Sequence, residues 1–115
     1  MTTVRVVDDD ESIAGMLRVL LEHDGLTVAL TTRDFHNLLN PTLWNGVDTA
    51  LIDLNLGGDI TGISVLTYLR TEHPQIRRVV LSAITDISEA HLGDLADAAL
   101  TKPSDFAEIL RQVRL

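Results

Sequence analysis

The chain of 115 residues has no cysteine, a single lysine and an aromatic content of only 3%. Without cysteine it cannot form disulfides, thiolate nucleophiles or zinc-thiolate sites. No uninterrupted apolar stretch approaches the length of a membrane span, and the N-terminus lacks the basic and then apolar layout of a signal peptide. We therefore expect an intracellular, cytoplasmic protein with no membrane partner and with an aliphatic core.

A basic surface is also missing. The chain has 17 acidic residues against 9 lysines and arginines, so its formal net charge is −8, and its densest basic stretch is the pair Arg77–Arg78. Nucleic-acid binding normally needs a clustered basic patch, so we expect no direct contact with nucleic acid. The length and the hydrophobic share of 45% predict one folded domain spanning residues 1–115.

Short apolar runs rich in β-branched residues recur along the chain and mostly do not alternate with polar residues. This pattern is typical of strands that are covered on both faces. Segments with helical spacing separate the runs, and this alternation predicts an α/β fold: a doubly wound, five-stranded parallel sheet with helices on both faces. The five expected strands are Val4–Val7, Leu26–Leu30, Ala50–Ile52, Ile76–Leu81 and Ala98–Leu100.

The spacing of apolar residues predicts helices between and after these runs. It is clearest at Ile13–Leu21, Leu66–Leu69 and Phe106–Val113. Two further helices are expected from poorer patterns, at Arg33–Leu43, which an Asn-Pro pair interrupts, and at Ile87–Leu95, which contains a glycine.

Carboxylates close two of the predicted strands. Asp8 and Asp9 follow the first strand and Asp53 follows the third. Carboxyl ends of neighbouring parallel strands meet at one edge, where open α/β sheets build their sites. A desolvated pair of like charges needs a counter-charge, and Mg²⁺ suits carboxylate and carbonyl oxygens. The alternative is structural: acidic residues favour a helix start, which accounts for Asp10 and Glu11, and Asp53 would cap a loop.

Two further polar residues end the last two strands. Lys102, which precedes Pro103, is interpreted as a fixed cation that pairs with Asp53, and the alternative is a solvated lysine. Ser82 is either an ordinary polar strand end or a hydroxyl that donates to a phosphoryl oxygen. With a metal and an ammonium to neutralise those oxygens, Asp53 could act as a nucleophile toward phosphorus. The sequence leaves the isomer of the Lys102–Pro103 bond open.

Four motifs, each after its own strand, resemble those of the receiver domains of two-component response regulators, and the resemblance covers essentially the whole chain. They are Val-Val-Asp-Asp-Asp-Glu at 6–11, Leu-Ile-Asp-Leu-Asn-Leu at 51–56 with Gly62 after it, Val-Val-Leu-Ser-Ala at 79–83 and Leu-Thr-Lys-Pro at 100–103. The four together, in this order, are a specific signal. The resemblance implies the flavodoxin-like fold of CheY-like domains.

The resemblance also implies a function and a set of site residues. Asp53 would accept a phosphoryl group from the phosphohistidine of a sensor histidine kinase or a histidine phosphotransfer protein. The remaining residues divide into metal ligands and phosphoryl-binding groups. Asp9, Asp53 and the backbone carbonyl of Asn55 would bind Mg²⁺, with Asp8 binding directly or through water, and Ser82 and Lys102 would hold phosphoryl oxygens.

By the same resemblance the domain is a signalling module and not a true enzyme, since it catalyses only its own phosphorylation and slow dephosphorylation. The phosphorylated state would shift Ser82 and the loop after it, and a downstream protein target or output domain would read that change. The surface formed by the fourth helix, fifth strand and fifth helix is the expected partner face. Homodimerisation stays open.

Three positions depart from the family pattern. Ala99 stands where the family often carries an aromatic switch residue, and Ser104 stands where an apolar residue is frequent. The loop from Asp53 to Gly62 is one residue longer than the common form and lacks its proline. We further hypothesise that Ile84 and Asn55 restrict attacking water and so prolong the life of the acyl phosphate.

Two other readings compete with a phosphorylation switch. Ala99 and the atypical loop favour a receiver-like module that no longer cycles phosphate and serves only in protein interaction or dimerisation. A haloacid-dehalogenase-like phosphatase would need a second aspartate where Asn55 stands. A flavodoxin-like cofactor binder would need a hydroxyl- and glycine-rich loop where Asp8–Glu11 stand.

Overall fold

The computed structural model describes residues 2–115, which form a five-stranded sheet with helices on both faces. Every neighbouring pair of strands is parallel, and the order across the sheet is β2-β1-β3-β4-β5. The predicted strands and fold class are confirmed, with each strand boundary within one residue of its expected place. The strands are β1 (Thr3–Val7), β2 (Thr27–Thr31), β3 (Thr49–Ile52), β4 (Arg77–Ser82) and β5 (Ala98–Thr101).

Side-chain caps fix the starts of several helices. The Asp10 carboxylate accepts hydrogen bonds from the backbone N–H groups of Ser12 and Ile13 at 2.9 and 3.1 Å, which satisfies donors that the helix itself leaves free. Thr61 and Asp105 cap two later helices in the same way. The α-helices are α1 (Glu11–His23), α2 (Gly62–Glu72), α3 (Ile84–Ala90) and α4 (Phe106–Arg114), and the 3₁₀ helices are η1 (Phe35–Leu39) and η2 (Pro41–Trp44).

Two expected helices differ from the structure. The segment Arg33–Leu43 forms two 3₁₀ helices in place of an α-helix, because Asn40 takes an extended conformation before Pro41 and separates them. The helix expected at Ile87–Leu95 begins three residues earlier, at Ile84, and ends at Ala90, since His91 turns into the left-handed region with φ 49°.

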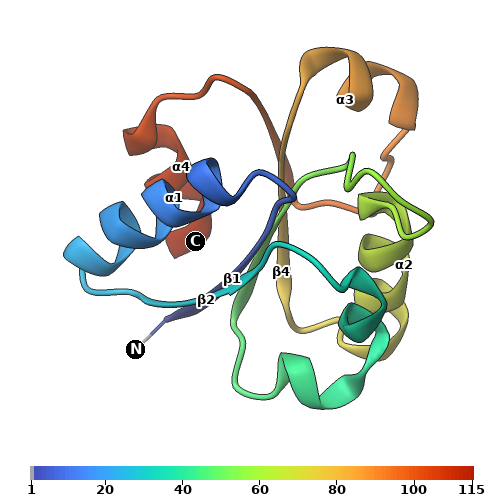
Figure 1. Ribbon diagram of the computed structural model, residues 1–115, viewed down its shortest axis with the longest axis horizontal. Coiled ribbons are helices and arrows are strands. Elements are labelled where there is room, and N and C mark those ends of the chain that lie inside the picture. Colours follow the sequence, from blue (N-terminus) through green and yellow to red (C-terminus); the bar gives the residue numbers. More distant parts are fainter. Residues whose placement is uncertain (1) are drawn as a thin grey trace.

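The sheet separates two apolar cores. Figure 1 shows α1 and α4 on one side of the strands and α2 and α3 on the other. Successive strand residues point to opposite faces, so Leu51 packs beneath α1 and α4 while Ile52 packs beneath α2 and the 3₁₀ helices. All four residues of β3 are buried, as expected for a central strand covered on both sides. Trp44 is the one tryptophan, and it lies in the same core as Ile52. Its indole N–H donates to the Leu38 carbonyl oxygen at 2.7 Å.

The strand order creates a crevice at one edge of the sheet. The chain leaves β1 toward β2 on one side, while β3 lies on the other side of β1. The loops that leave the carboxyl ends of β1 and β3 therefore diverge, and open α/β sheets bind ligands at such a point.

Within residues 2–115 the structure has no helix of the length and apolarity that crossing a bilayer requires.

Candidate functional site

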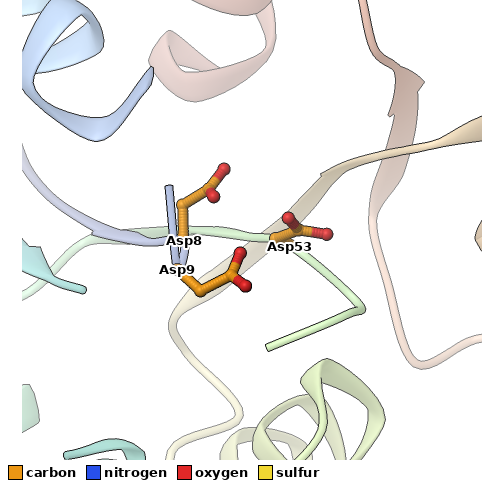
Figure 2. A group of neighbouring side chains, drawn as sticks. All are labelled: Asp8, Asp9 and Asp53. Atoms are coloured by element: carbon orange, nitrogen blue, oxygen red, sulfur yellow. The ribbon is translucent and has the colours of Figure 1, made fainter. Parts of the chain in front are cut away.

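Three carboxylates meet in this crevice. Asp8 and Asp9 follow β1 and Asp53 follows β3, and one oxygen from each lies within 4.8 Å of the others (Figure 2). Asp8 and Asp53 are 2% and 7% exposed, whereas Asp9 is exposed. The Asp10 backbone N–H donates to Asp8 Oδ1 at 2.9 Å, so the start of α1 orients the buried carboxylate.

Lys102 supplies a cation to the two buried carboxylates. Its Nζ lies 2.7 Å from Asp8 Oδ2 and 2.9 Å from Asp53 Oδ2. Burial raises the pKa of Asp8 above its usual range, and the hydrogen bond from Lys102 offsets only part of that rise. Burial by itself would lower the pKa of Lys102, but the hydrogen bonds and charges of Asp8 and Asp53 outweigh it and raise that pKa.

Ser82 fixes the second oxygen of Asp53. Its hydroxyl, which is fully buried at the end of β4, donates to Asp53 Oδ1 at 2.6 Å and accepts the Leu54 backbone N–H at 3.3 Å. Asp53 Oδ1 also accepts the Asn55 N–H at 3.1 Å. The Lys102 backbone N–H donates to the Ser82 carbonyl at 2.8 Å, which holds the two strand ends together, and the Lys102–Pro103 bond is cis.

The loop after Asp53 folds closely over the carboxylates. Gly57 has φ 74°, and a Cβ at this position would lie 3.3 Å from Asp9 Oδ2. The Asn55 side-chain oxygen accepts the Gly57 N–H at 3.1 Å, which stabilises this turn. At Gly62, a Cβ would overlap the Asp53 carbonyl oxygen and the Leu54 Cα, so the first residue of α2 must be glycine for the loop to close as it does.

The donor set fits a hard divalent cation. Three carboxylates supply the oxygen ligands that Mg²⁺ prefers, and the exposure of Asp9 leaves an open side for water. Thiolate ligands cannot compete at this edge, because the chain has no cysteine. The crevice therefore combines negative oxygens for a metal with one ammonium and one hydroxyl aimed at the same carboxylate.

Five of the predicted site residues meet here, and the sixth flanks them. Asn55 contacts Asp53 through its backbone N–H, while the assignment of its carbonyl as a metal ligand stays a prediction. Ala99 and Ile84 are both exposed, the latter by 64%. Sequence reasoning did not assign a role to the Asp10 N–H, and it named Gly62 without finding its contact with Asp53. The glycine in the family motif was the signal for that contact. The five that meet are Asp8, Asp9, Asp53, Ser82 and Lys102.

Comparisons with known proteins point to one family. The model of the response regulator receiver domain matches residues 4–114. The DNA-binding response regulator MtrA of Mycobacterium tuberculosis is 34% identical over 96% of this chain and 48% of its own length. The chain thus spans about half the length of the curated relatives it matches.

Solved structures agree in fold. A response regulator from Burkholderia pseudomallei, solved with a phosphorylated aspartic acid, a calcium ion and citrate, has a TM-score of 0.79 and 29% identity, covering 98% of this chain and 66% of that one. Thermotoga maritima TrrA, solved with Mg²⁺ and BeF, has a TM-score of 0.86 and 21% identity, covering 99% and 97%. TrrA has also been solved in complex with the histidine kinase ThkA.

The doubly wound sheet, the acidic crevice with its lysine and serine, and the family match over nearly all residues lead to one assignment. The chain belongs to the response regulator receiver domain family of two-component signalling systems.

Proposed function

We propose that Asp53 accepts a phosphoryl group from the phosphohistidine of a sensor histidine kinase or a histidine phosphotransfer protein. The observation that carries this proposal is the double engagement of Asp53, with Ser82 Oγ at 2.6 Å from one oxygen and Lys102 Nζ at 2.9 Å from the other. The phosphorylated aspartic acid of the Burkholderia pseudomallei relative supports the same chemistry.

The transfer is a displacement at phosphorus. A carboxylate oxygen of Asp53 attacks, the new O–P bond forms, and the N–P bond of the phosphohistidine breaks. Its electron pair stays on the imidazole nitrogen, which then takes a proton. Lys102 and Ser82 already donate to the attacking carboxylate. Both can therefore donate to the phosphoryl oxygens as negative charge develops there, with little rearrangement.

We propose Mg²⁺ as the cofactor, held by the carboxylates of Asp9 and Asp53 and by the backbone carbonyl of Asn55, with Asp8 binding directly or through water. When bound, the ion would neutralise phosphoryl oxygens that would otherwise repel the carboxylate. Asp8 stays paired to Lys102 without metal, so it would serve to orient the ammonium as well as the ion.

The output of the switch is proposed from the contacts of Ser82. The Ser82 hydroxyl donates to Asp53 Oδ1 and accepts the Leu54 N–H, so a phosphoryl oxygen that takes over the donated hydrogen bond would draw the hydroxyl away from Asp53 and move the loop before α3. A downstream protein target or output domain in the cytoplasm would read that movement. We propose that residues 1–115 form one receiver domain and that this segment itself, with a net charge of −8, does not contact DNA.

The test is a mass measurement. The protein is incubated with acetyl phosphate, with and without MgCl₂, and its intact mass is followed. We expect the addition of one phosphoryl group, dependent on Mg²⁺, in the wild type and in D59N, whose exposed aspartate lies in the same loop. D53N should gain none. Equal labelling of D53N, or no labelling of the wild type by acetyl phosphate or by a phosphorylated histidine kinase, would overturn the proposal.

The second candidate is the receiver-like interaction module that does not cycle phosphate. Ala99 favours it, because this exposed position of β5 carries no aromatic side chain to couple to Ser82. The same mass measurement separates the two functions, since the interaction module would stay unlabelled under every condition. A labelled protein whose surface does not change on labelling would show that phosphorylation of Asp53 is not coupled to a structural switch.

A further inference from the structure

A charged residue interrupts the first strand. Arg5 lies between the buried Val4 and Val6, on the face of the sheet that carries η1 and η2. Its Nε donates to the Leu43 carbonyl at 3.2 Å and its Nη1 donates to Thr31 Oγ1 at 2.9 Å. The guanidinium carbon lies 5.9 Å from the centre of the Trp44 ring, so the cation is fixed against an aromatic face.

This partly buried cation has no counter-ion. In residues 2–115, Arg5 makes no ion pair, and its hydrogen-bond partners are all neutral oxygens. Burial lowers the pKa of Arg5, which reflects the cost of holding the charge away from water. Nη2 donates no hydrogen bond in the described residues, and because every fully buried side-chain nitrogen and oxygen there has a partner, Nη2 retains some exposure to solvent. The guanidinium therefore keeps the N–H groups of Nη2 available for a ligand.

Arg5 lines a cavity of about 260 Å³. Around it lie two guanidinium groups and one carboxylate, so the charged lining is net positive in a chain whose net charge is −8. The carboxylate of Asp34 pairs with neither arginine in the described residues. Hydroxyl and amide groups complete the polar wall. The polar lining residues are Arg5, Thr31, Thr32, Arg33, Asp34 and Asn37.

We propose that this cavity, named here the Arg5 pocket, binds a small oxyanion, a phosphate or a carboxylate group, at the free Nη2 of the Arg5 guanidinium. The two N–H groups of Nη2 can donate to oxygens of either group, and Arg33 in the same lining adds a second guanidinium. Threonine hydroxyls and the Asn37 amide can donate to the remaining oxygens. The volume is sufficient for a ligand of a few heavy atoms.

The Arg5 pocket is separate from the carboxylate crevice. It opens beside the carboxyl end of β2, whereas the crevice lies between β1 and β3. Thr31 borders both regions: its hydroxyl accepts from Arg5, and its backbone carbonyl accepts the Asp8 N–H at 3.2 Å. The proposal stands whether or not Asp53 is phosphorylated.

The single tryptophan offers a direct probe. The protein is titrated without divalent metal using sodium phosphate in one arm and sodium acetate in a second, with sodium chloride at matched ionic strength as reference. We expect a saturable change of Trp44 fluorescence, together with backbone amide NMR shifts centred on Thr32 and Asn37. A stronger response to phosphate assigns a phosphoryl ligand, and a stronger response to acetate assigns a carboxylate.

Variants localise the binding. We expect binding about tenfold weaker in R5M and several-fold weaker in R33Q, with R18Q, an exposed arginine on α1, unchanged. If R5M does not fold, R33Q and N37A carry the test because both side chains are exposed. A response to both anions no different from chloride, NMR shifts centred on Lys102, or wild-type affinity in R33Q and N37A would each overturn the proposal.

Discussion

The Lys102 ammonium lies 2.7 Å from the Asp8 carboxylate, although 94 residues separate them in the chain. The same nitrogen contacts Asp53, so the metal-free crevice contains its own counter-ion for the two carboxylates that are least exposed to water. Breaking such a pair leaves a buried charge uncompensated. A divalent metal must therefore compete with this ammonium for the oxygens of Asp8 and Asp53.

Replacement of Lys102 by Met separates metal binding from phosphoryl acceptance. We expect K102M to bind Mg²⁺ several-fold more tightly, because no ammonium occupies the carboxylate oxygens, and to accept a phosphoryl group about a hundredfold more slowly. Isothermal calorimetry measures the first effect and intact mass the second. T101A, at an exposed neighbouring position, is the control and should match the wild type. Weaker Mg²⁺ binding in K102M would show that the lysine supports the metal.

Asp9 illustrates a conflict between stability and function. It makes no hydrogen bond or ion pair within residues 2–115, yet its carboxylate lies within 4.8 Å of two others. We expect D9N to raise the free energy of unfolding of the metal-free protein by a few tenths to about 1 kcal/mol by relieving repulsion, and to abolish measurable Mg²⁺ binding. Urea unfolding with and without Mg²⁺ tests both effects. Destabilisation of the metal-free protein by D9N would contradict this expectation.

Gly62 sets the closeness of the loop to Asp53. A methyl group at this position overlaps backbone atoms, so G62A should lower the free energy of unfolding by about 1–3 kcal/mol and slow labelling of Asp53. The matched control is G58A, since a Cβ at Gly58 meets nothing within 4 Å. Denaturant midpoints and the mass measurement give the two readouts. Equal stability of the two variants would mean that the loop moves away from the added methyl group at little cost in free energy.

Ile84 is the residue expected to govern the life of the acyl phosphate. It stands two positions after Ser82 and is 64% exposed at the start of α3. We expect I84N to shorten the life of the phosphorylated state several-fold, because a polar side chain there can orient water that an apolar one excludes. The lifetime is measured from the decay of the phosphorylated mass after acetyl phosphate is removed. The control is V19N, whose side chain on α1 is similarly exposed and which should lose its phosphoryl group at the wild-type rate. If I84N also loses its phosphoryl group at the wild-type rate, Ile84 does not control the lifetime of the acyl phosphate.

The raised pKa of Lys102 predicts a pH dependence at the alkaline end. A cation whose pKa is higher in the folded than in the unfolded state contributes stability that is fully present below the unfolded pKa of about 10.4. This contribution is lost as the pH rises through the folded pKa. The difference in unfolding free energy between wild type and K102M should therefore be constant from pH 7 to 9 and shrink near pH 11. A constant difference over the whole range would exclude this linkage.

Local patterns predicted most of the secondary structure because burial on both faces is visible as short apolar runs. The predicted α-helix at Arg33–Leu43 was wrong, because the extended Asn40 divides the segment into two 3₁₀ helices. The Arg5 pocket was also missed. The available signal was an arginine inside a buried strand, but its neighbours Trp44 and Asn37 become neighbours only when η1 and η2 pack against the sheet.

The sequence by itself determined which polar side chains stand at the strand ends, since carboxylates follow β1 and β3, Ser82 ends β4 and the one lysine follows β5. Only the tertiary structure decided how they combine: Lys102 reaches Asp8 as well as Asp53, and Ser82 and Lys102 take opposite oxygens of one carboxylate. The reason is physical. Strand endings depend on local periodicity, whereas a contact across 94 residues depends on the order of strands in the sheet and on the packing that orients each side chain.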